Sequence, residues 1–141
     1  MADAANNLVV TERFYAALAA ADARALLELL DPSFHAELTE GLPEGWGGVY
    51  TTARDMLDRG WGPIFRVLGS RPVPEEYLAC GPDRIVVLGR YQGRHRRTGR
   101  LLDATFAHVL GFAGGRIRSL RQITDSARWR DCVMGDGEET C

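Results

Sequence analysis

The apolar positions of this chain change their spacing about halfway along, from a helical period to an alternating one. Between 7 and 30 they recur at helical spacing, which predicts one helix and then a shorter one capped by Asp22. The same spacing returns between 52 and 66, where Gly60 and Pro63 are expected to bend the helix or break it in two.

Alternating patterns fill much of the remaining chain. A first strand is expected at 34–40, and four more at 73–80, 83–95, 101–112 and 116–124. A glycine pair between the last two strands predicts a tight hairpin turn. Helices followed by antiparallel strands are typical of an α+β domain, in which helices cover one face of a curved sheet and close a pocket.

Length and composition point to one ordinary globular domain. We place it at 1–130, with Asp125 capping a last helical turn and residues 131–141 forming a disordered tail. A net charge of -2 argues against a nucleic-acid partner. No segment has the roughly 20 apolar residues of a membrane span, and the N-terminus does not follow the pattern of a signal peptide.

The three cysteines are widely spaced and lack a pairing motif. They indicate neither a disulfide framework nor a zinc site. We therefore expect a cytoplasmic protein with free thiols and no metal.

One histidine, His108, lies in the middle of the expected strand 101–112. Strand side chains alternate between faces, so it shares a face with Ala104, Phe106 and Leu110. An imidazole among apolar neighbours is either a core residue satisfied by a hydrogen bond or the polar point of a ligand pocket. In the second case it would serve as a general acid or base with a pKa near neutrality.

Several short motifs follow one another in a recognisable order. They are Thr39-Glu40-Gly41-Leu42-Pro43 before Gly47-Gly48, Val87–Gly93, Thr98-Gly99-Arg100 with Phe106–Val109, Gly115-Arg116-Ile117, and Arg121–Ser126. Together they resemble the SnoaL-like members of the NTF2-like, or ketosteroid-isomerase-like, superfamily, from about Val9 to Trp129. The resemblance implies a cone in which N-terminal helices pack on a strongly curved, mainly antiparallel sheet. That family includes isomerases, polyketide cyclases, epoxide hydrolases and non-enzymatic binders, so it implies a pocket rather than a reaction.

The chain departs from the acidic residues used in that family. By the closing motif, Gln122 stands where epoxide-hydrolase-like members and polyketide cyclases have an aspartate on the last strand. No carboxylate occurs around Tyr91, where the epoxide hydrolases have another. Those mechanisms therefore cannot be transferred intact.

Alternation and the family pattern give a candidate set of pocket residues. Its polar members are Glu40, Tyr91, His108 and Gln122, and its expected lining is Leu38, Trp46, Trp61, Phe106 and Thr124. Glu40 is either a solvated loop carboxylate or, if buried, the acid–base partner of His108. Tyr91 is either core packing or a donor to an oxyanion or epoxide oxygen, and Gln122 is suited to holding water or a substrate carbonyl.

The opposite sheet face carries charged and apolar positions with other candidate roles. Asp103 is expected there, paired with Arg100 or Arg121. The basic turn 94–100 is either solvated or a dock for an acidic carrier protein or a phosphate-bearing substrate. The family pattern also implies a homodimer through this face, for which the alternate residues Leu101, Thr105, Ala107 and Val109 are available.

The sequence thus favours a cofactor-free enzyme for a hydrophobic, oxygenated small molecule of polyketide or terpenoid type. Isomerisation or cyclisation is expected, epoxide-opening cyclisation included, with His108 and Glu40 sharing the acid and base roles. Tyr91 would stabilise charge on oxygen. The alternatives are a non-catalytic binder, an epoxide hydrolase, or a dimerisation domain with an occluded pocket.

Overall fold

A computed structural model describes residues 4–135 and begins with two helices. Helix α1 spans Ala4–Ala20 and helix α2 spans Ala23–Leu29. Asp22 caps α2 as expected, because its carboxylate accepts a hydrogen bond from the backbone N–H of Ala25 at 3.1 Å. Strand β1, Leu30–Leu38, follows α2 directly, so it begins earlier than expected and ends two residues before Glu40.

Six strands form one sheet in the order β2-β1-β6-β5-β4-β3. Neighbours pair antiparallel except β1 and β6, which pair parallel. The remaining strands are β2 (Gly48–Tyr50), β3 (Arg71–Ala79), β4 (Arg84–Arg94), β5 (Leu101–Ala113) and β6 (Arg116–Thr124). The mostly antiparallel α+β architecture is confirmed, while the short strand β2 was not expected from the sequence.

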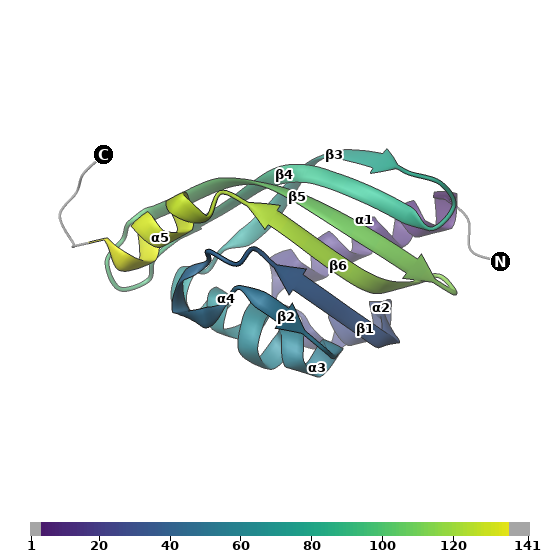
Figure 1. The fold of residues 1–141 in the computed structure, drawn as a ribbon, viewed down its shortest axis with the longest axis horizontal. Helices are drawn as coiled ribbons and strands as arrows, with labels where there is room; N and C mark the ends of the chain where they lie inside the picture. Colours follow the sequence, from purple (N-terminus) through teal and green to yellow (C-terminus); the bar gives the residue numbers. More distant parts are fainter. Residues whose placement is uncertain (1–3, 136–141) are drawn as a thin grey trace.

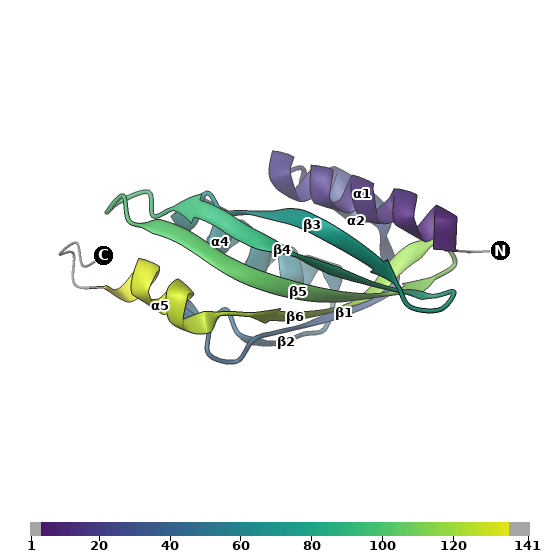
Figure 2. The same cartoon turned by 90° about the horizontal axis from the view of Figure 1, so that it is seen from above.

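The sheet is arched, and the helices gather on one of its faces (Figure 1). Helices α1 and α2 lie behind the long strands in that view, and α1 stands clear of the strands on one side when the molecule is turned (Figure 2). The space between this helical layer and the sheet holds the buried apolar side chains, including Phe14, Leu26 and Leu110.

The second helical region stays helical where a bend or a break was expected. Helix α3 (Ala53–Asp55) continues through a π-helical segment, Met56–Trp61, into α4 (Gly62–Leu68). The N–H of Gly62 bonds to the carbonyl of Leu57, five residues back, which is the wider hydrogen-bonding pattern of a π-helix. A Cβ on Gly60 would collide with Met56, so this position packs without a side chain.

The chain closes with helix α5, Ser126–Met134. Asp125 caps it, accepting from the N–H of Arg128 at 3.4 Å. The helix passes position 130, where we expected the domain to end, and residues 136–141 of the expected tail lie outside the described part of the chain. Within residues 4–135, no helix has both the length and the apolarity needed to cross a bilayer.

Candidate functional site

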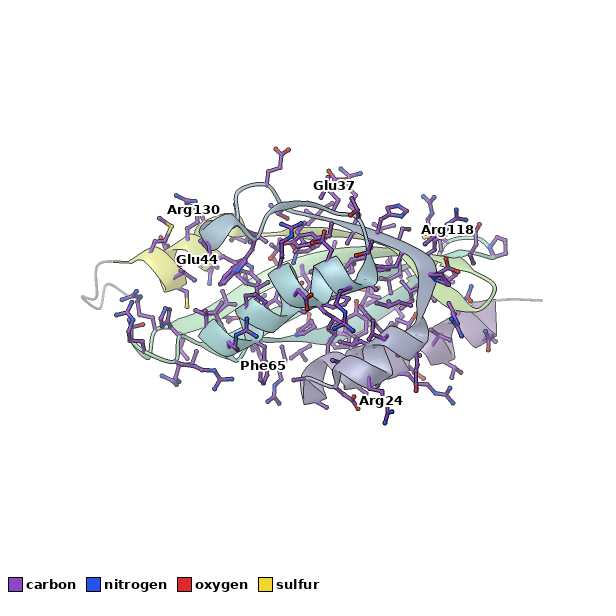
Figure 3. The ribbon with its side chains drawn as sticks, turned by 90° about the horizontal axis from the view of Figure 1, so that it is seen from below. Arg24, Glu37, Glu44, Phe65, Arg118 and Arg130 are labelled. Carbon is purple, nitrogen blue, oxygen red and sulfur yellow. The ribbon has the colours of Figure 1, made fainter. Side chains whose placement is uncertain are left out.

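A cavity of about 220 Å³ lies between the helices and the concave face of the sheet. Its wall is formed by residues of α1, α2, the π-helical segment, α4, α5 and the strands β1 and β3–β6, among them Phe14, Leu38, Trp61, Tyr91, His108 and Gln122. Figure 3 shows α4, with Phe65 labelled, lying across the sheet and side chains filling the layer between them. Most of the wall is apolar, so its few polar groups decide which ligands fit.

His108 lies on the sheet side of this cavity and is held by two tyrosines. The hydroxyl of Tyr15, from α1, lies 2.6 Å from Nδ1 of the imidazole. The hydroxyl of Tyr91, from β4, lies 2.7 Å from Nε2. Both ring nitrogens of His108 are therefore occupied by protein partners.

Gln122 extends this network to the end of β1. Its Oε1 accepts from the backbone N–H of Thr39 at 3.2 Å, which orients the amide so that Nε2 donates to the Tyr91 hydroxyl at 2.7 Å. The hydroxyl of Thr39 donates to the carbonyl of Gln122 at 3.0 Å and accepts from the N–H of Thr124 at 3.1 Å. These hydrogen bonds between Thr39 and β6 take the place of backbone strand pairing after Leu38. They also hold the Gln122 amide in one orientation.

Each tautomer of His108 leaves one tyrosine hydroxyl hydrogen without a protein acceptor, and we assign the imidazole hydrogen to Nε2 because Tyr91 lines the cavity and Tyr15 does not. A hydrogen on Nδ1 would make Tyr15 an acceptor, and the buried Tyr15 hydroxyl hydrogen would then have no acceptor among the described residues. With the hydrogen on Nε2, Tyr15 donates to Nδ1, and Tyr91 accepts from both His108 and Gln122. The hydroxyl hydrogen of Tyr91 then has no protein acceptor in the described chain and is available at the cavity wall.

Burial keeps every member of this network neutral. It lowers the pKa of His108 from 6.5 to about 3. It raises the pKa of Tyr91 well above its ordinary value, against a smaller opposing effect of the Gln122 hydrogen bond. Burial likewise raises the pKa of Tyr15. The expected near-neutral pKa of His108 is therefore wrong, and the site offers a neutral phenol hydrogen rather than a charged acid.

An aromatic layer holds the imidazole in place from behind. The ring of Phe106 stacks on His108 with centroids 4.0 Å apart, and it contacts Tyr91 at 4.8 Å. Trp129, from α5, packs against Tyr91 at an interplanar angle of 74° with centroids 5.0 Å apart, and it also lines the cavity. These contacts restrict the Tyr91 ring, so its hydroxyl is presented in one direction.

Glu40 does not join the site. Strand β1 ends at Leu38, and Glu40 lies exposed in the following turn, outside the cavity wall. The expected pairing of Glu40 with His108 is wrong, because the two tyrosines occupy both imidazole nitrogens. No Asp or Glu lines the cavity in the part of the chain that the structure describes.

The other expected lining residues divide into two groups. Leu38, Trp61, Tyr91, His108 and Gln122 line the cavity. Trp46, Phe106 and Thr124 do not: Trp46 is buried against Trp129 with centroids 6.2 Å apart, Phe106 lies behind the imidazole, and the Thr124 hydroxyl donates to the carbonyl of Thr105 at 2.6 Å.

Two residues of the site were missed by the sequence analysis. Tyr15 faces His108 across 93 positions of sequence, and helical spacing alone marks it only as an apolar-face residue. The sequence marks Trp129 only as the end of the family resemblance, and its place in the cavity wall depends on how α5 folds back on the sheet.

The outer face of the sheet carries the remaining candidates. Asp103 is on that face as expected, but its guanidinium partner is Arg90, at 2.7 Å, because β4 and β5 place these two residues diagonally on one face. Arg100 instead donates to the carbonyl of Cys132 at 3.0 Å. Leu101 and Thr105 are exposed, and Ala107 and Val109 are half-buried.

The model of the SnoaL-like domain family matches residues 11–120. The chain belongs to this family. No curated protein matches it. Among solved structures, it is similar to an NTF2-like protein of unknown function from Burkholderia pseudomallei, with 25% identity and a TM-score of 0.82 over 91% of this chain and 97% of that one.

Two further solved structures resemble this SnoaL-like domain. TerC, co-crystallized with polyporic acid, has 22% identity and a TM-score of 0.81, covering 92% of this chain and 98% of its own. A candidate SnoaL-like polyketide cyclase from Jannaschia sp. CCS1 has 16% identity and a TM-score of 0.78, covering 92% of each chain. These likenesses show the NTF2-like fold, so the family and fold expected from the motifs are confirmed.

Proposed function

We propose that this SnoaL-like protein binds a hydrophobic small molecule and activates one of its oxygen atoms through the hydroxyl of Tyr91. The ligand oxygen is a carbonyl, enol or epoxide oxygen, and the reaction is a cofactor-free isomerisation or cyclisation. The observation that carries this proposal is the position of the Tyr91 hydroxyl at the wall of an apolar cavity. With the imidazole hydrogen of His108 on Nε2, the hydrogen of this hydroxyl has no protein acceptor among the described residues.

The size of the cavity supports a ring-containing ligand. An apolar cavity of roughly 150 Å³ takes up benzene, so about 220 Å³ leaves room for a bicyclic ring system. Oxygenated rings of polyketide or terpenoid type have this size and polarity. The co-crystallization of TerC with polyporic acid is a precedent for an organic ligand with a protein of this fold.

Tyr91 is well placed to stabilise negative charge that develops on the ligand oxygen. His108 and Gln122 both donate to its hydroxyl oxygen, which strengthens Tyr91 as a donor as charge builds up beyond it. His108 is thus a positioning residue, oriented in turn by Tyr15. In a low-dielectric cavity, one such hydrogen bond contributes about 10²-fold or more to the rate.

The lack of a carboxylate among the described wall residues narrows the reaction type. Hydrolysis of an epoxide requires a base to activate water, but the described wall has no carboxylate and both nitrogens of its imidazole are occupied by tyrosines. Ring closure by a nucleophile of the ligand itself requires mainly an activated electrophile. Enolisation with solvent as the proton acceptor has the same requirement, so these reactions suit the site better than hydrolysis.

Hydrogen–deuterium exchange of 2-tetralone in D₂O tests this proposal. This bicyclic ketone exchanges the hydrogens next to its carbonyl by enolisation, which NMR follows directly. We expect saturable acceleration by the protein and a loss of about 10²-fold in Tyr91→Phe. Tyr77→Phe is the matched control, because Tyr77 does not line the cavity. Exchange no faster than in buffer, at a protein concentration that binds the ketone, would contradict catalysis.

A non-catalytic binding protein is the second candidate. It is favoured by the pKa values, since neither His108 nor Tyr91 changes its protonation near neutral pH. In that case the polar network would serve only to select the ligand. Saturable binding of 2-tetralone that depends on Tyr91, without faster exchange, would identify this role.

A further inference from the structure

The mouth of the cavity differs from its floor in charge. Tyr91, His108 and Gln122 at the floor are buried, whereas Ala21, Ala23 and Arg66 are exposed, which marks the opening between the α1–α2 turn and α4. Arg66 is the only side chain of the described wall that is charged at neutral pH. A ligand that enters through this opening therefore meets a guanidinium at the cavity rim.

No acidic group of the described chain neutralises Arg66. The ion pairs within residues 4–135 use Arg54, Arg59, Arg90 and Arg128, and no hydrogen bond engages the Arg66 side chain. Its Nη1 atom would lie 3.3 Å from a Cβ placed on Gly62, which also lines the cavity. The guanidinium therefore lies over the cavity side of α4 with its donors unused.

The surface beside the mouth is also basic. Phe65 lines both the cavity and an adjacent open groove. The charged side chains of that groove are Arg71, Arg94 and Arg96, and no Asp or Glu belongs to its described lining. Arg96 is fixed over the Phe65 ring at 5.1 Å. Although the whole chain carries a net charge of -2, this edge attracts anions.

We propose that the ligand carries a carboxylate that binds Arg66 at the mouth while its oxygen at the other end accepts from Tyr91. The guanidinium fork matches a carboxylate with two parallel hydrogen bonds. The substrate class is then a hydrophobic ring acid with a carbonyl or enol oxygen. This inference rests on the proposed function, because it requires the ligand to occupy the cavity.

Calorimetric titration with two probes of the same shape tests the inference. The probes are 6-hydroxy-2-naphthoate, which is anionic at pH 7, and the neutral 6-hydroxy-2-naphthamide. We expect the wild-type protein to bind the acid about five- to tenfold more tightly than the amide. In Arg66→Gln this preference is lost while the affinity for the amide is unchanged. Arg71→Gln, the matched control, removes a charge from the groove outside the cavity wall and keeps most of the preference.

The outcomes separate this inference from the proposed function. Tyr91→Phe is expected to weaken the binding of both probes. If it does so but Arg66→Gln leaves the preference for the acid intact, the carboxylate contact is wrong and the proposed function stands. If Arg66→Gln lowers the affinity for the acid and for the amide by the same factor, the carboxylate contact is also wrong. If neither probe binds, or if Tyr91→Phe binds both probes as tightly as the wild-type protein, both proposals fail.

Discussion

The hydroxyl of Tyr15 lies 2.6 Å from Nδ1 of His108, joining the first helix to the middle of β5. This contact determines the state of the whole network. With the imidazole hydrogen on Nε2, Tyr15 donates to Nδ1, Nε2–H is directed to Tyr91, and the hydrogen of the Tyr91 hydroxyl remains available to a ligand. A residue outside the cavity wall thereby sets the hydrogen-bonding capacity of one within it.

Tyr15→Phe should destabilise the fold, because it leaves a buried imidazole nitrogen without its donor. We expect the free energy of unfolding in urea to fall by about 1–3 kcal/mol. Tyr77→Phe is the control, since the Tyr77 hydroxyl has no hydrogen bond within the described chain, and its effect should stay within about 0.5 kcal/mol. Equal effects of the two substitutions would contradict the assigned network.

His108 should make stability fall as the pH drops. The unfolded chain protonates this imidazole below about pH 6.5, whereas burial delays protonation in the folded state to about pH 3. Between these values the unfolded state binds one more proton, so stability falls by about 1.4 kcal/mol per pH unit from this residue. His108→Gln should reduce the slope of unfolding free energy against pH between 4 and 6 by about that amount. The same slope in both proteins would show that His108 titrates normally.

Glu40→Gln should leave the site intact, because the Glu40 side chain is exposed and outside the cavity wall. Deuterium exchange of 2-tetralone is expected to stay within about twofold of the wild-type rate, as for a surface substitution. If Glu40→Gln lowered the exchange rate as much as Tyr91→Phe does, Glu40 would have the acid–base role that the sequence suggested.

The cap of α5 should matter for both stability and the cavity, because this helix carries Trp129. Asp125→Ala removes the acceptor for the Arg128 N–H and should cost about 1 kcal/mol in unfolding free energy. It should also weaken binding of the naphthamide probe. Asp131→Ala, at an exposed position of the same helix, serves as the control and should change neither quantity appreciably. Identical behaviour of the two variants would contradict the role of the cap.

The sequence predicted the elements better than their contacts. Hydrophobic period and turn residues located both N-terminal helices and the four long strands from β3 to β6, because those signals are local. The inward position of Tyr91, His108 and Gln122 followed from alternation and the family motif. The continuous helix through Gly60 could not be read from local propensity, since π-helical hydrogen bonding replaces the expected break.

The misplacement of Glu40 has a physical cause in the strand pairing. Alternation put Glu40 on the same face as Leu38, which assumes that the strand continues. Instead, the Thr39 N–H bonds to the side chain of Gln122, and strand β1 ends. Contacts between distant segments, such as Tyr15 with His108, depend on the docking of helix on sheet and leave no pattern in one sequence.

The most direct test of the account is the carbonyl stretching frequency of 2-tetralone bound to the protein, measured by difference infrared spectroscopy. A hydrogen bond from Tyr91 weakens the C=O bond, so the band should lie below its position in an apolar solvent. In Tyr91→Phe the band should return toward the apolar-solvent position, while Tyr77→Phe should leave it shifted. An unshifted band in the wild-type protein, or the same shifted band in Tyr91→Phe, would contradict the claim that Tyr91 donates to the ligand.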